Sequence, residues 1–448
     1  MGKLALITKV GEEDTGVDVS GREYLKTGNL KMFTASSSVS VHALLSSLKK
    51  LKLEPSEVAM DLLVVASTMY AADTRIDRKT FGEDSWTRII DLYIPVSDPV
   101  RWSNQSDRLQ KIFRFLTGDI WTLYFRPRTN MPILSPRGNR KKYKMPYNTD
   151  TVCLFSGGMD SFIGAIDLLE RGIRPLLVGH SKSADVAPYQ SKCAAALASH
   201  YNNIAPQRIH AFLSIPKEDL FDSLDNTERG RSFLFLTLGG VCASSLNQTS
   251  TLVIPENGMI SLNLPLTPLR IGSHSTRTTH PYYLKMMQEL FSQLGLGVTL
   301  HNPYQFKTKG EMLIECANQS LVINTETMSC SHPAAGRYQG GVGSSNKHCG
   351  YCVPCIIRQS SFRAASQHDP FPYGVDLHST PIDIKTAKGA DVIAFKYMIE
   401  KVKRHPSYLT AAIRNTGRLG TQVQRYVDVY SRALNEVDQF LNGVTLTA

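Results

Sequence analysis

The chain has 448 residues, more than one ordinary domain holds, and two or three domains are expected. Its composition is 42% hydrophobic and 20% charged, as in a soluble globular protein, and no run of eighteen apolar residues occurs. These features argue against a membrane-spanning helix, and because no export signal is visible at the N-terminus we expect a cytoplasmic location. The net charge of +11 suits an anionic ligand such as a nucleotide, or a nucleic acid.

Residues 1–145 are expected to form an N-terminal α+β domain that binds a partner or an acceptor. Residues 89–96 alternate in the manner of a strand, but the block contains no recognisable catalytic motif. The polar run at residues 70–78 is interpreted as a solvated, salt-bridged surface in preference to a binding loop. Proline, glycine and consecutive cations at residues 136–146 predict a linker, with a phosphate-facing basic patch as the alternative.

From residue 151 onward, strands and helices alternate. Apolar runs predict strands over residues 151–155, 175–180, 209–215 and 252–254, and the intervening patterns predict helices that end near residue 169 or cover residues 186–200 and 232–246. Such alternation predicts an α/β fold in which helices cover both faces of a parallel sheet. Beyond residue 383, apolar residues at helical spacing predict a helical C-terminal tail.

A glycine loop joins the first of these strands to its helix, with the sequence Ser156-Gly157-Gly158-Met159-Asp160-Ser161. The two glycines let the backbone approach a ligand closely, and the N–H groups at the start of the helix form an anion cradle. The serine hydroxyls add donors, and Asp160 can cap the helix or help to hold Mg²⁺. No lysine follows as in the Walker A motif, so this is a different kind of phosphate-binding loop.

Four of the eight cysteines crowd into one stretch, namely Cys330, Cys349, Cys352 and Cys355. In a reducing compartment such a cluster more often binds a metal than forms disulfides, and four thiolates are the number that a structural zinc site needs. His332 and His348 are alternative ligands that rank below Cys330. A redox or persulfide role for the C-x-x-C pairs is the competing hypothesis.

The glycine loop resembles the signature of the PP-loop ATP pyrophosphatases, which have an adenine nucleotide alpha hydrolase-like fold and split ATP between its α and β phosphates. Residues 327–330 (T-M-S-C) and 349–358 (C-G-Y-C-V-P-C-I-I-R) resemble the 7-cyano-7-deazaguanine synthase (QueC) family. Residues 308–312 and 227–232 resemble that family's threonine-lysine segment and its arginine-containing entry to the central helix. The likeness covers roughly residues 150–365.

This resemblance implies an enzyme that uses Mg²⁺-ATP to adenylate the carboxylate of 7-carboxy-7-deazaguanine, or a related base, before transfer to an amine, with a structural zinc ion. It implies that the glycine loop, from Ser156 to Ser161, cradles the pyrophosphate. Gly179 and His180, at the end of the second predicted strand, are also assigned to the nucleotide site. Asp160 and Ser161 are assigned to catalysis with Lys309 and Arg231, the candidate cations for the phosphates, although either cation is equally interpretable as a surface charge.

Candidate substrate contacts follow the fourth predicted strand. Glu256 and Asn257 end that strand, where open α/β sheets place their ligands, and Arg277 and His280 are expected to read the substrate there. The chain departs from the QueC family at this point, because residues 273–281 read S-H-S-T-R-T-T-H-P where the family has its Y-P-D-C-R segment. The departure lies in the substrate segment and not in the loop that is expected to bind ATP.

The longer architecture resembles the QueC-like subunits of Qat-type anti-phage defence systems. We therefore expect partner proteins from the same operon, with ammonia or a partner amine as acceptor. The expected division is an N-terminal domain (1–145), a PP-loop domain (146–328), a zinc knuckle (329–372) and a helical extension (373–448). A tRNA-modifying sulfurtransferase and a non-catalytic ATP-sensing scaffold are the alternative functions, and a nucleic-acid partner is not favoured.

Overall fold

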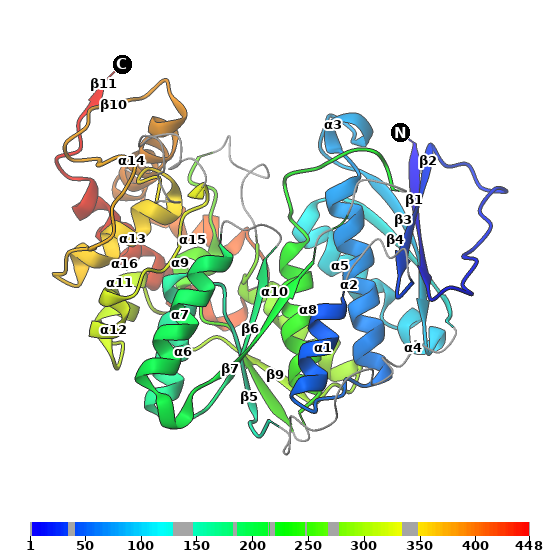
Figure 1. Ribbon diagram of the computed structural model, residues 1–448. Helices are drawn as coiled ribbons and strands as arrows, with labels where there is room; N and C mark the ends of the chain where they lie inside the picture. The colour runs from blue at the N-terminus through cyan, green and yellow to red at the C-terminus, as the bar shows by residue number, and fades with distance from the viewer. Residues whose placement is uncertain are drawn as a thin grey trace, which may run out of the picture.

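A computed structural model describes residues 2–34, 41–128, 147–181, 186–213, 215, 220–246, 249–267, 277–333 and 348–447. The predicted linker at 136–146 lies outside these residues, as do residues 273–276 of the predicted substrate segment. Within the described residues the fold is α/β, with parallel sheets flanked by helices (Figure 1). No helix in this part of the chain combines the length and the apolar character that crossing a bilayer requires.

The first sheet is built from the N-terminal block, and its described strands run in the order β2-β1-β3-β4. These strands are β1 (Lys3–Val10), β2 (Lys26–Met32), β3 (Ile89–Val96) and β4 (Ile120–Pro127). Each neighbouring pair is parallel, so this part is α/β and the expected α+β arrangement is wrong. Parallel neighbours need long crossover connections. The connections between β2 and β4 contain the helices α1 (His42–Lys50), α2 (Glu57–Arg75), α3 (Arg78–Phe81), α4 (Pro99–Ser103) and α5 (Ser106–Thr117).

The second sheet is the one that the sequence predicts, and its described strands run in the order β7-β6-β5-β8-β9. They are β5 (Thr151–Leu154), β6 (Leu176–Ser181), β7 (Gln207–Phe212), β8 (Ser250–Val253) and β9 (Val298–His301). The associated helices are α6 (Met159–Glu170), α7 (Ala187–His200), α8 (Arg231–Ser244), α9 (Gly258–Leu262) and α10 (Pro281–Gln293), with a short 3₁₀ turn at Asn202–Ile204. All pairings are parallel, which confirms the predicted type of sheet.

The side chains of β5 alternate between two hydrophobic cores, as the period of a strand requires. Val152 and Leu154 face a core that continues through α8 and α2 to the N-terminal sheet. Cys153 and Phe155 face a second core on the side of α6. The helices α1, α2 and α8 lie between the two sheets (Figure 1). The N-terminal block and the second sheet therefore share one continuous core.

The polar run at residues 70–78 is buried at this junction, so its interpretation as a solvated surface is wrong. Most of it forms the end of α2. The Arg78 guanidinium donates two hydrogen bonds to Asp119 (2.8 and 2.9 Å), and Arg88 pairs with Asp119 (2.6 Å) and with Asp73 (3.1 Å). Asp73 also accepts the backbone N–H of Gly230 at the start of α8 (2.7 Å). Charges from distant parts of the chain pair with one another here, and this pairing offsets the free-energy cost of removing them from water.

The remaining helices form the third part of the molecule. They are α11 (Lys309–Ile314), α12 (Gln319–Asn324), α13 (Val353–Ala364), α14 (Ala387–Arg404), α15 (Ser407–Arg414) and α16 (Val423–Leu441), with a 3₁₀ turn at Gly420–Gln422. Beyond residue 373 the chain is mainly helical, as predicted, and it adds a short parallel pair between β10 (Ile382–Asp383) and β11 (Leu446–Thr447). The tail helices share a core with α9 and α13, so the tail is packed onto the second sheet's loops.

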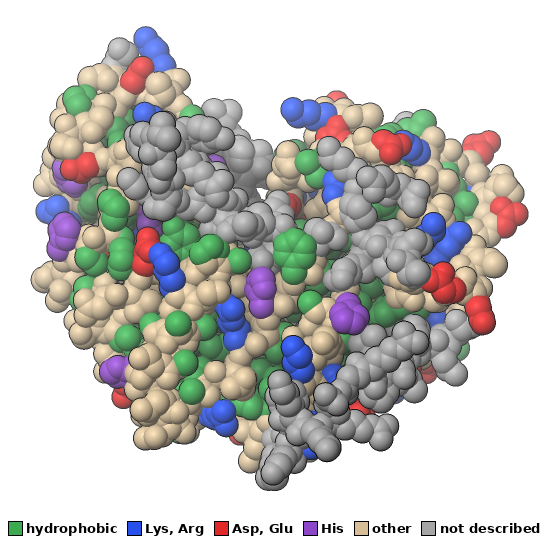
Figure 2. Space-filling model, viewed as in Figure 1, with side chains coloured by type: hydrophobic (Ala, Val, Ile, Leu, Met, Phe, Trp, Pro, Cys, Tyr) green, Lys and Arg blue, Asp and Glu red, His purple; other side chains and the backbone are tan. Residues whose placement is uncertain are grey.

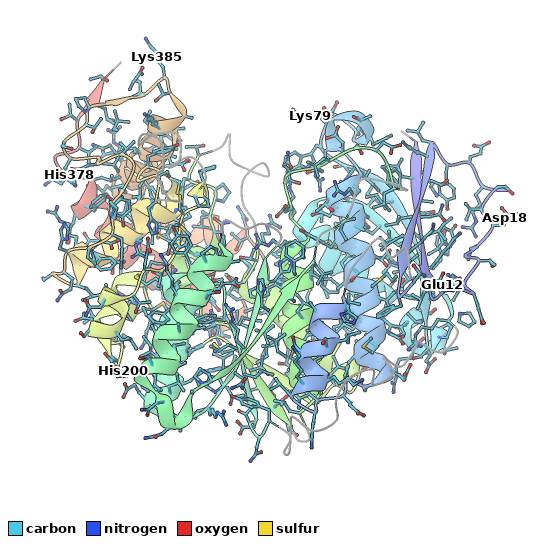
Figure 3. The ribbon with its side chains drawn as sticks, viewed as in Figure 1. Glu12, Asp18, Lys79, His200, His378 and Lys385 are labelled. Atoms are coloured by element: carbon cyan, nitrogen blue, oxygen red, sulfur yellow. The ribbon has the colours of Figure 1, made fainter. Side chains whose placement is uncertain are left out.

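The outline of the molecule has two lobes in the view of Figure 2, and the surface is indented between them. One lobe carries the N-terminal sheet and the other carries the tail. Glu12 and Asp18, on the connection between β1 and β2, lie on the opposite side of the view from the tail residues His378 and Lys385 (Figure 3). On the face shown in Figure 2, positive and negative side chains are interspersed.

Candidate functional site

The glycine loop lies between the end of β5 and the start of α6. Gly157 has a φ of +81°, and a Cβ at this position would lie 2.8 Å from the backbone N of Gln190. Both facts require glycine there. Ser161, in the first turn of α6, donates a hydrogen bond to the Gly158 carbonyl (2.9 Å) and accepts one from the Ser156 N–H (3.2 Å). The loop is thus folded back on the N-terminal end of the helix.

A cavity of about 220 Å³ opens beside this loop. Its lining from the loop and α6 consists of Ser156, Gly158, Met159, Asp160 and Ser161. Other elements supply the remaining lining residues, which are Pro255, Glu256, Ile260, Lys309, Met328, Ser329, Pro354 and Ile357. The structure therefore brings together most of the predicted nucleotide residues, the predicted cation Lys309 and the predicted substrate residue Glu256.

Asp160 is the centre of a buried polar cluster in this cavity. Its Oδ2 accepts hydrogen bonds from the backbone N–H of Asn257 (3.1 Å) and from Asn257 Nδ2 (2.7 Å), and its Oδ1 pairs with the ammonium group of Lys309. Asp160 and Lys309 are only 6% and 7% exposed. Asn257 also caps α9 by accepting the Ile260 N–H (3.0 Å). Asp160 therefore does not cap its own helix but links α6 to the turn after β8.

The two carboxyl groups of the cluster differ in charge. Burial by itself would raise the pKa of Asp160, but Lys309 and the hydrogen bonds from Glu256, Lys309 and Asn257 lower it below its usual value. Burial, followed by the negative charge of Asp160, raises the pKa of Glu256 well above its usual range. The shifts therefore favour the ionised form of Asp160 and the protonated form of Glu256. This arrangement leaves Lys309 compensated by a single carboxylate.

The helix that carries Lys309 is fastened to the tail. Thr308 caps α11 and its hydroxyl bonds the carboxyl group of Glu436 on α16. Glu436 also accepts the Gly310 N–H (3.4 Å). Burial raises the pKa of Glu436 to about 7, and Glu311 adds to the rise, whereas Thr308, Gly310 and Arg432 lower it. The position of Lys309 thus depends on a contact with the C-terminal helix.

Gly179 and His180 lie at the end of β6, next to the loop but outside the lining of the cavity. The side chain of Gln190 connects the two segments, because its Nε2 donates to the carbonyls of Ser156 (3.2 Å) and His180 (3.3 Å). Gln190 is fully buried and sits on α7. The assignment of Gly179 and His180 to the nucleotide remains a prediction.

The structure places Arg231, Arg277 and His280 away from the lining of the cavity. Arg231 begins α8 and faces Glu228 at 3.9 Å. Arg277 lies over the Phe115 ring of α5 and donates to the Phe115 carbonyl (3.2 Å). Both ring nitrogens of His280 are engaged, by the Tyr282 N–H and by the Thr416 hydroxyl, and burial followed by Arg277 lowers its pKa to about 3. Arg277 and His280 therefore connect the start of α10 to α5 and to the segment that follows α15.

Sequence reasoning missed Met328 and Ser329 as parts of the cavity. The Met328 N–H donates to the Gly157 carbonyl (2.9 Å), which attaches this segment to the glycine loop. Ser329 lines the cavity, and its hydroxyl is buried without a partner among the described residues. Ser329 directly precedes the predicted metal ligand Cys330 in the T-x-S-C motif, and this position could have identified it.

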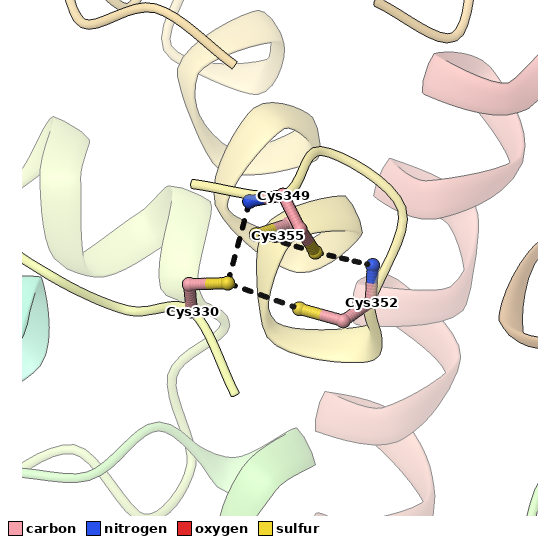
Figure 4. A group of neighbouring side chains, drawn as sticks. All are labelled: Cys330, Cys349, Cys352 and Cys355. Carbon is pink, nitrogen blue, oxygen red and sulfur yellow. Dashed lines mark hydrogen bonds between the residues drawn. The ribbon is translucent and has the colours of Figure 1, made fainter. Parts of the chain in front are cut away.

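The four cysteines of the cluster come together, as predicted (Figure 4). Their sulfur atoms all lie within 4.8 Å of one another, with Cys330 and Cys352 at 3.8 Å and Cys349 and Cys355 at 3.9 Å. Tetrahedral Zn–S bonds of about 2.3 Å imply sulfurs about 3.8 Å apart. Gly350 allows the tight turn, because its φ is +94° and a Cβ would lie 2.0 Å from the Val375 carbonyl oxygen.

The chemistry of the cluster also suits a metal. Hydrogen bonds within the cluster lower the pKa of the Cys349 thiol and raise the pKa of the Cys352 thiol, and burial together with such bonds raises the pKa of the Cys355 thiol. The four sulfurs therefore share their protons, and Cys349 is favoured as the thiolate. Backbone N–H groups of Cys349 and Cys352 point at sulfur atoms (3.3 and 3.4 Å). His348 is engaged elsewhere, since its Nε2 accepts the Ser329 N–H (3.2 Å). The four cysteines form a cluster that could bind a metal such as zinc.

The cluster and the cavity share a scaffold. Cys355 and the cavity residues Pro354 and Ile357 belong to α13, and Cys330 directly follows Ser329. The buried Arg358 of α13 bonds the Thr327 hydroxyl (2.6 Å) and thereby holds the start of the same segment. The cysteine cluster therefore holds in place the same helix and the same segment that form part of the cavity wall. Neither a protein-family model nor a curated protein sequence matches this chain.

Proposed function

We propose that the chain is a PP-loop ATP pyrophosphatase that adenylates a carboxylate and passes the acyl group to an amine. The observation that carries the proposal is the cavity beside the glycine loop, where three hydroxyls, the N-terminal end of α6 and the buried Lys309 converge. Such a set of donors with one cation suits the phosphates of a nucleotide. The resemblance to the QueC family supplies the carboxylated base and the defence context.

The topology of the second sheet supports a ligand at this place. The chain runs from β5 outward to β6 and β7, and then returns to β8 on the other side of β5. The order therefore reverses between β5 and β8. Open α/β sheets bind their ligands at such a switch point, beyond the carboxyl ends of the strands. The glycine loop follows β5, and the turn with Glu256 and Asn257 follows β8, so both flank that point.

The charges in the cavity suit departure of pyrophosphate. In the proposed reaction a substrate carboxylate oxygen bonds to the α-phosphorus while the bond to the β-phosphate oxygen breaks. The negative charge that develops on the leaving pyrophosphate is met by Lys309 and by the hydroxyls of Ser156 and Ser329, whereas the Ser161 hydroxyl donates its one proton to the Gly158 carbonyl and so holds the loop. An amine then attacks the acyl carbon, AMP leaves, and the amine loses a proton. Asp160 holds Lys309 and the Asn257 turn in position.

Magnesium accompanies ATP in reactions of this kind and takes oxygen ligands. The carboxyl groups that this cavity offers are Asp160 and Glu256, but both oxygens of Asp160 already bond Lys309 or Asn257. Because the shifted pKa of Glu256 favours its protonated form, neither carboxyl group offers a free carboxylate, and the residues present do not fit a magnesium ion held by the protein. At the cysteine cluster we propose zinc in a structural role, because four thiols fill the tetrahedral coordination of the ion and leave no position open for a substrate.

The proposal is tested by substitutions with matched controls. Lys309→Met and Ser156→Ala should each lower AMP release from Mg²⁺-ATP and 7-carboxy-7-deazaguanine by about a hundredfold or more, the usual effect of removing one donor to a developing charge. Lys307→Met and Ser320→Ala change a lysine and a serine outside the cavity and should keep the wild-type rate within about twofold. A wild-type rate in Lys309→Met would show that the cavity is not the site of the reaction.

A further inference from the structure

A cavity of about 390 Å³ lies at the end of β9, and we call it the β9 cavity. Asn302 and Gln305 line it and follow this strand, while α10 and the turn between α15 and α16 supply most of its other walls. Asn302 Nδ2 donates to the carbonyl of Glu256, which lines the cavity beside the glycine loop (2.9 Å). The two cavities nevertheless have no described lining residue in common. The β9 cavity is therefore a separate cavity at the carboxyl edge of the second sheet, the edge where open α/β sheets bind ligands.

The turn between α15 and α16 is held against the start of α10. The Thr416 hydroxyl and His280 Nε2 are hydrogen-bonded (2.8 Å). Gly417 allows the two segments to approach closely, because a Cβ at this position would lie only 3.0 Å from the Cβ of Tyr282. Arg418 comes directly after Gly417 and lines the β9 cavity. The contact that fixes His280 thus also places a cation of the C-terminal tail at the cavity.

The charged side chains that line the β9 cavity are both cations. They are Lys285 of α10 and Arg418 of the tail, and the described lining contains no Asp, Glu or His. Glu289, four residues after Lys285, is its natural helical partner, but Glu289 pairs with Arg108 of α5 (3.7 Å). Around Arg418, residues 401–427 contain six Lys and Arg and no Asp or Glu. In the part of the chain that the structure describes, neither lining cation has an ion pair or a side-chain hydrogen bond, and both are exposed, so a ligand can reach them.

Neutral donors accompany the two cations. The Oε1 atom of Gln305 accepts the Tyr426 hydroxyl (2.9 Å), which leaves the Nε2 amide of Gln305 without a partner among the described residues. Thr421, in the tail turn, adds a hydroxyl, and Leu284 and Leu300 supply an apolar wall. The volume lies within the usual range of about 300–1,000 Å³ for small-molecule sites. The lining therefore suits a small anionic ligand.

We propose that the β9 cavity binds a phosphate group, free or as a small monoester, through Lys285 and Arg418. A phosphate monoester carries a charge of about −1.5 to −2 at pH 7, so one group compensates both cations, whereas a single carboxylate would compensate only one. Both kinds of cation bind phosphate oxygens through charge-assisted hydrogen bonds. The proposal goes beyond the proposed function and does not depend on it, because the two cavities have no described lining residue in common.

The test measures the binding of inorganic phosphate, AMP and adenosine to the full chain by calorimetry. The cavity beside the glycine loop should also take phosphate groups, so the measurements are made in the Lys309→Met chain, which lacks the cation of that cavity. Ser156→Ala is a second background. It removes one hydroxyl donor but keeps the buried pair of Asp160 and Lys309, so the result does not depend on the folding of a single variant.

In each background, Lys285→Met and Arg418→Met are combined. The matched control combines Lys388→Met and Arg414→Met, which remove the same charge from exposed positions of α14 and α15 outside the β9 cavity. We expect loss of the two lining cations to weaken AMP binding by at least about tenfold, and the control to stay within about twofold of its background. Adenosine lacks the phosphate group and should bind at least about tenfold more weakly than AMP.

Unchanged AMP binding without Lys285 and Arg418 would overturn the proposal, and so would an equal loss in the control pair. A chain that binds neither AMP nor phosphate in either background, or that binds adenosine as tightly as AMP, would also overturn it. Inorganic phosphate that binds as tightly as AMP would identify the free ion as the ligand, and tighter AMP would identify a monoester. Both of these results support a phosphate site in the β9 cavity.

Discussion

The charge balance around Lys309 makes a quantitative prediction for two conservative substitutions. The pKa shifts favour an ionised Asp160, which compensates Lys309, and a protonated Glu256, whose pKa is raised by burial and by the charge of Asp160. Asp160→Asn removes the compensating charge with little change of shape. The Glu256 pKa should then fall, because its main repulsive neighbour is gone. We expect Glu256 to ionise and to replace Asp160 as the partner of Lys309.

The expected costs follow from this exchange of partners. Loss of one partner from a buried ion pair costs about 3–5 kcal/mol when nothing replaces it. Because Glu256 replaces it, Asp160→Asn should cost only about 1–2 kcal/mol, mainly through weakened hydrogen bonds with Asn257. Glu256→Gln exchanges one neutral group for another and should cost less than about 1 kcal/mol. The double variant leaves Lys309 without either carboxylate and should cost the full amount of about 3–5 kcal/mol.

The assay is urea-induced unfolding of the wild type, both single variants and the double variant at pH 7, followed by circular dichroism. The free energies of unfolding form a double-mutant cycle, in which the double variant should lose about 2 kcal/mol more than the sum of the singles, taking the middle of each range. Additivity within about 0.5 kcal/mol would show that Glu256 does not take over from Asp160, and the assignment of charges in the cavity would be wrong.

Three further predictions concern the cluster, the buried ion network and the tail contact. Purified protein should contain one zinc ion per chain, and Cys352→Ser should lose the metal and unfold at lower temperature, whereas Cys316→Ser should keep it; a metal-free wild type would contradict the zinc proposal. Arg88→Met should cost about 3–5 kcal/mol of stability, whereas the surface-pair control Arg108→Met should cost less than about 1 kcal/mol, and equal small losses would refute the role of burial. The Glu436 pKa is raised from 4.5 to about 7, so the folded state holds this proton more tightly than the unfolded state does. The resulting contribution to the free energy of unfolding, about 3 kcal/mol, is complete below about pH 4.5 and is lost as pH rises through 7. Glu436→Gln should abolish this loss when unfolding is measured across the pH range, and an unchanged pH dependence would contradict the assignment.

The second sheet and the glycine loop could be predicted because their signals are local. Short apolar runs bounded by turns correspond to β5, β6, β7 and β8, and Ser156–Ser161 lies where a strand-loop-helix pattern requires it. The cysteine cluster was predictable from spacing, since three of its members fall within seven consecutive positions. In each case the residues that determine the structure are close together in the chain.

The failures depend on contacts between distant segments. The charges at residues 73–78 looked solvated because their partners, such as Asp119 and Asp225, lie far along the chain. The parallel order of the N-terminal sheet depends on crossovers that no local pattern reveals. Arg277 and His280 lie among contacts of α10, outside the lining of the cavity, and their role at the substrate stays a prediction.

The most direct test of the central proposal is the identity of the nucleotide products. Wild-type protein is incubated with Mg²⁺-ATP, 7-carboxy-7-deazaguanine and ammonia, and the phosphorus species are followed by ³¹P nuclear magnetic resonance. The proposed reaction releases AMP and pyrophosphate in equal amounts, and Asp160→Ala, with the cluster around Lys309 disrupted, should release neither. Release of ADP and inorganic phosphate, with no AMP, would contradict the assignment to the PP-loop ATP pyrophosphatases.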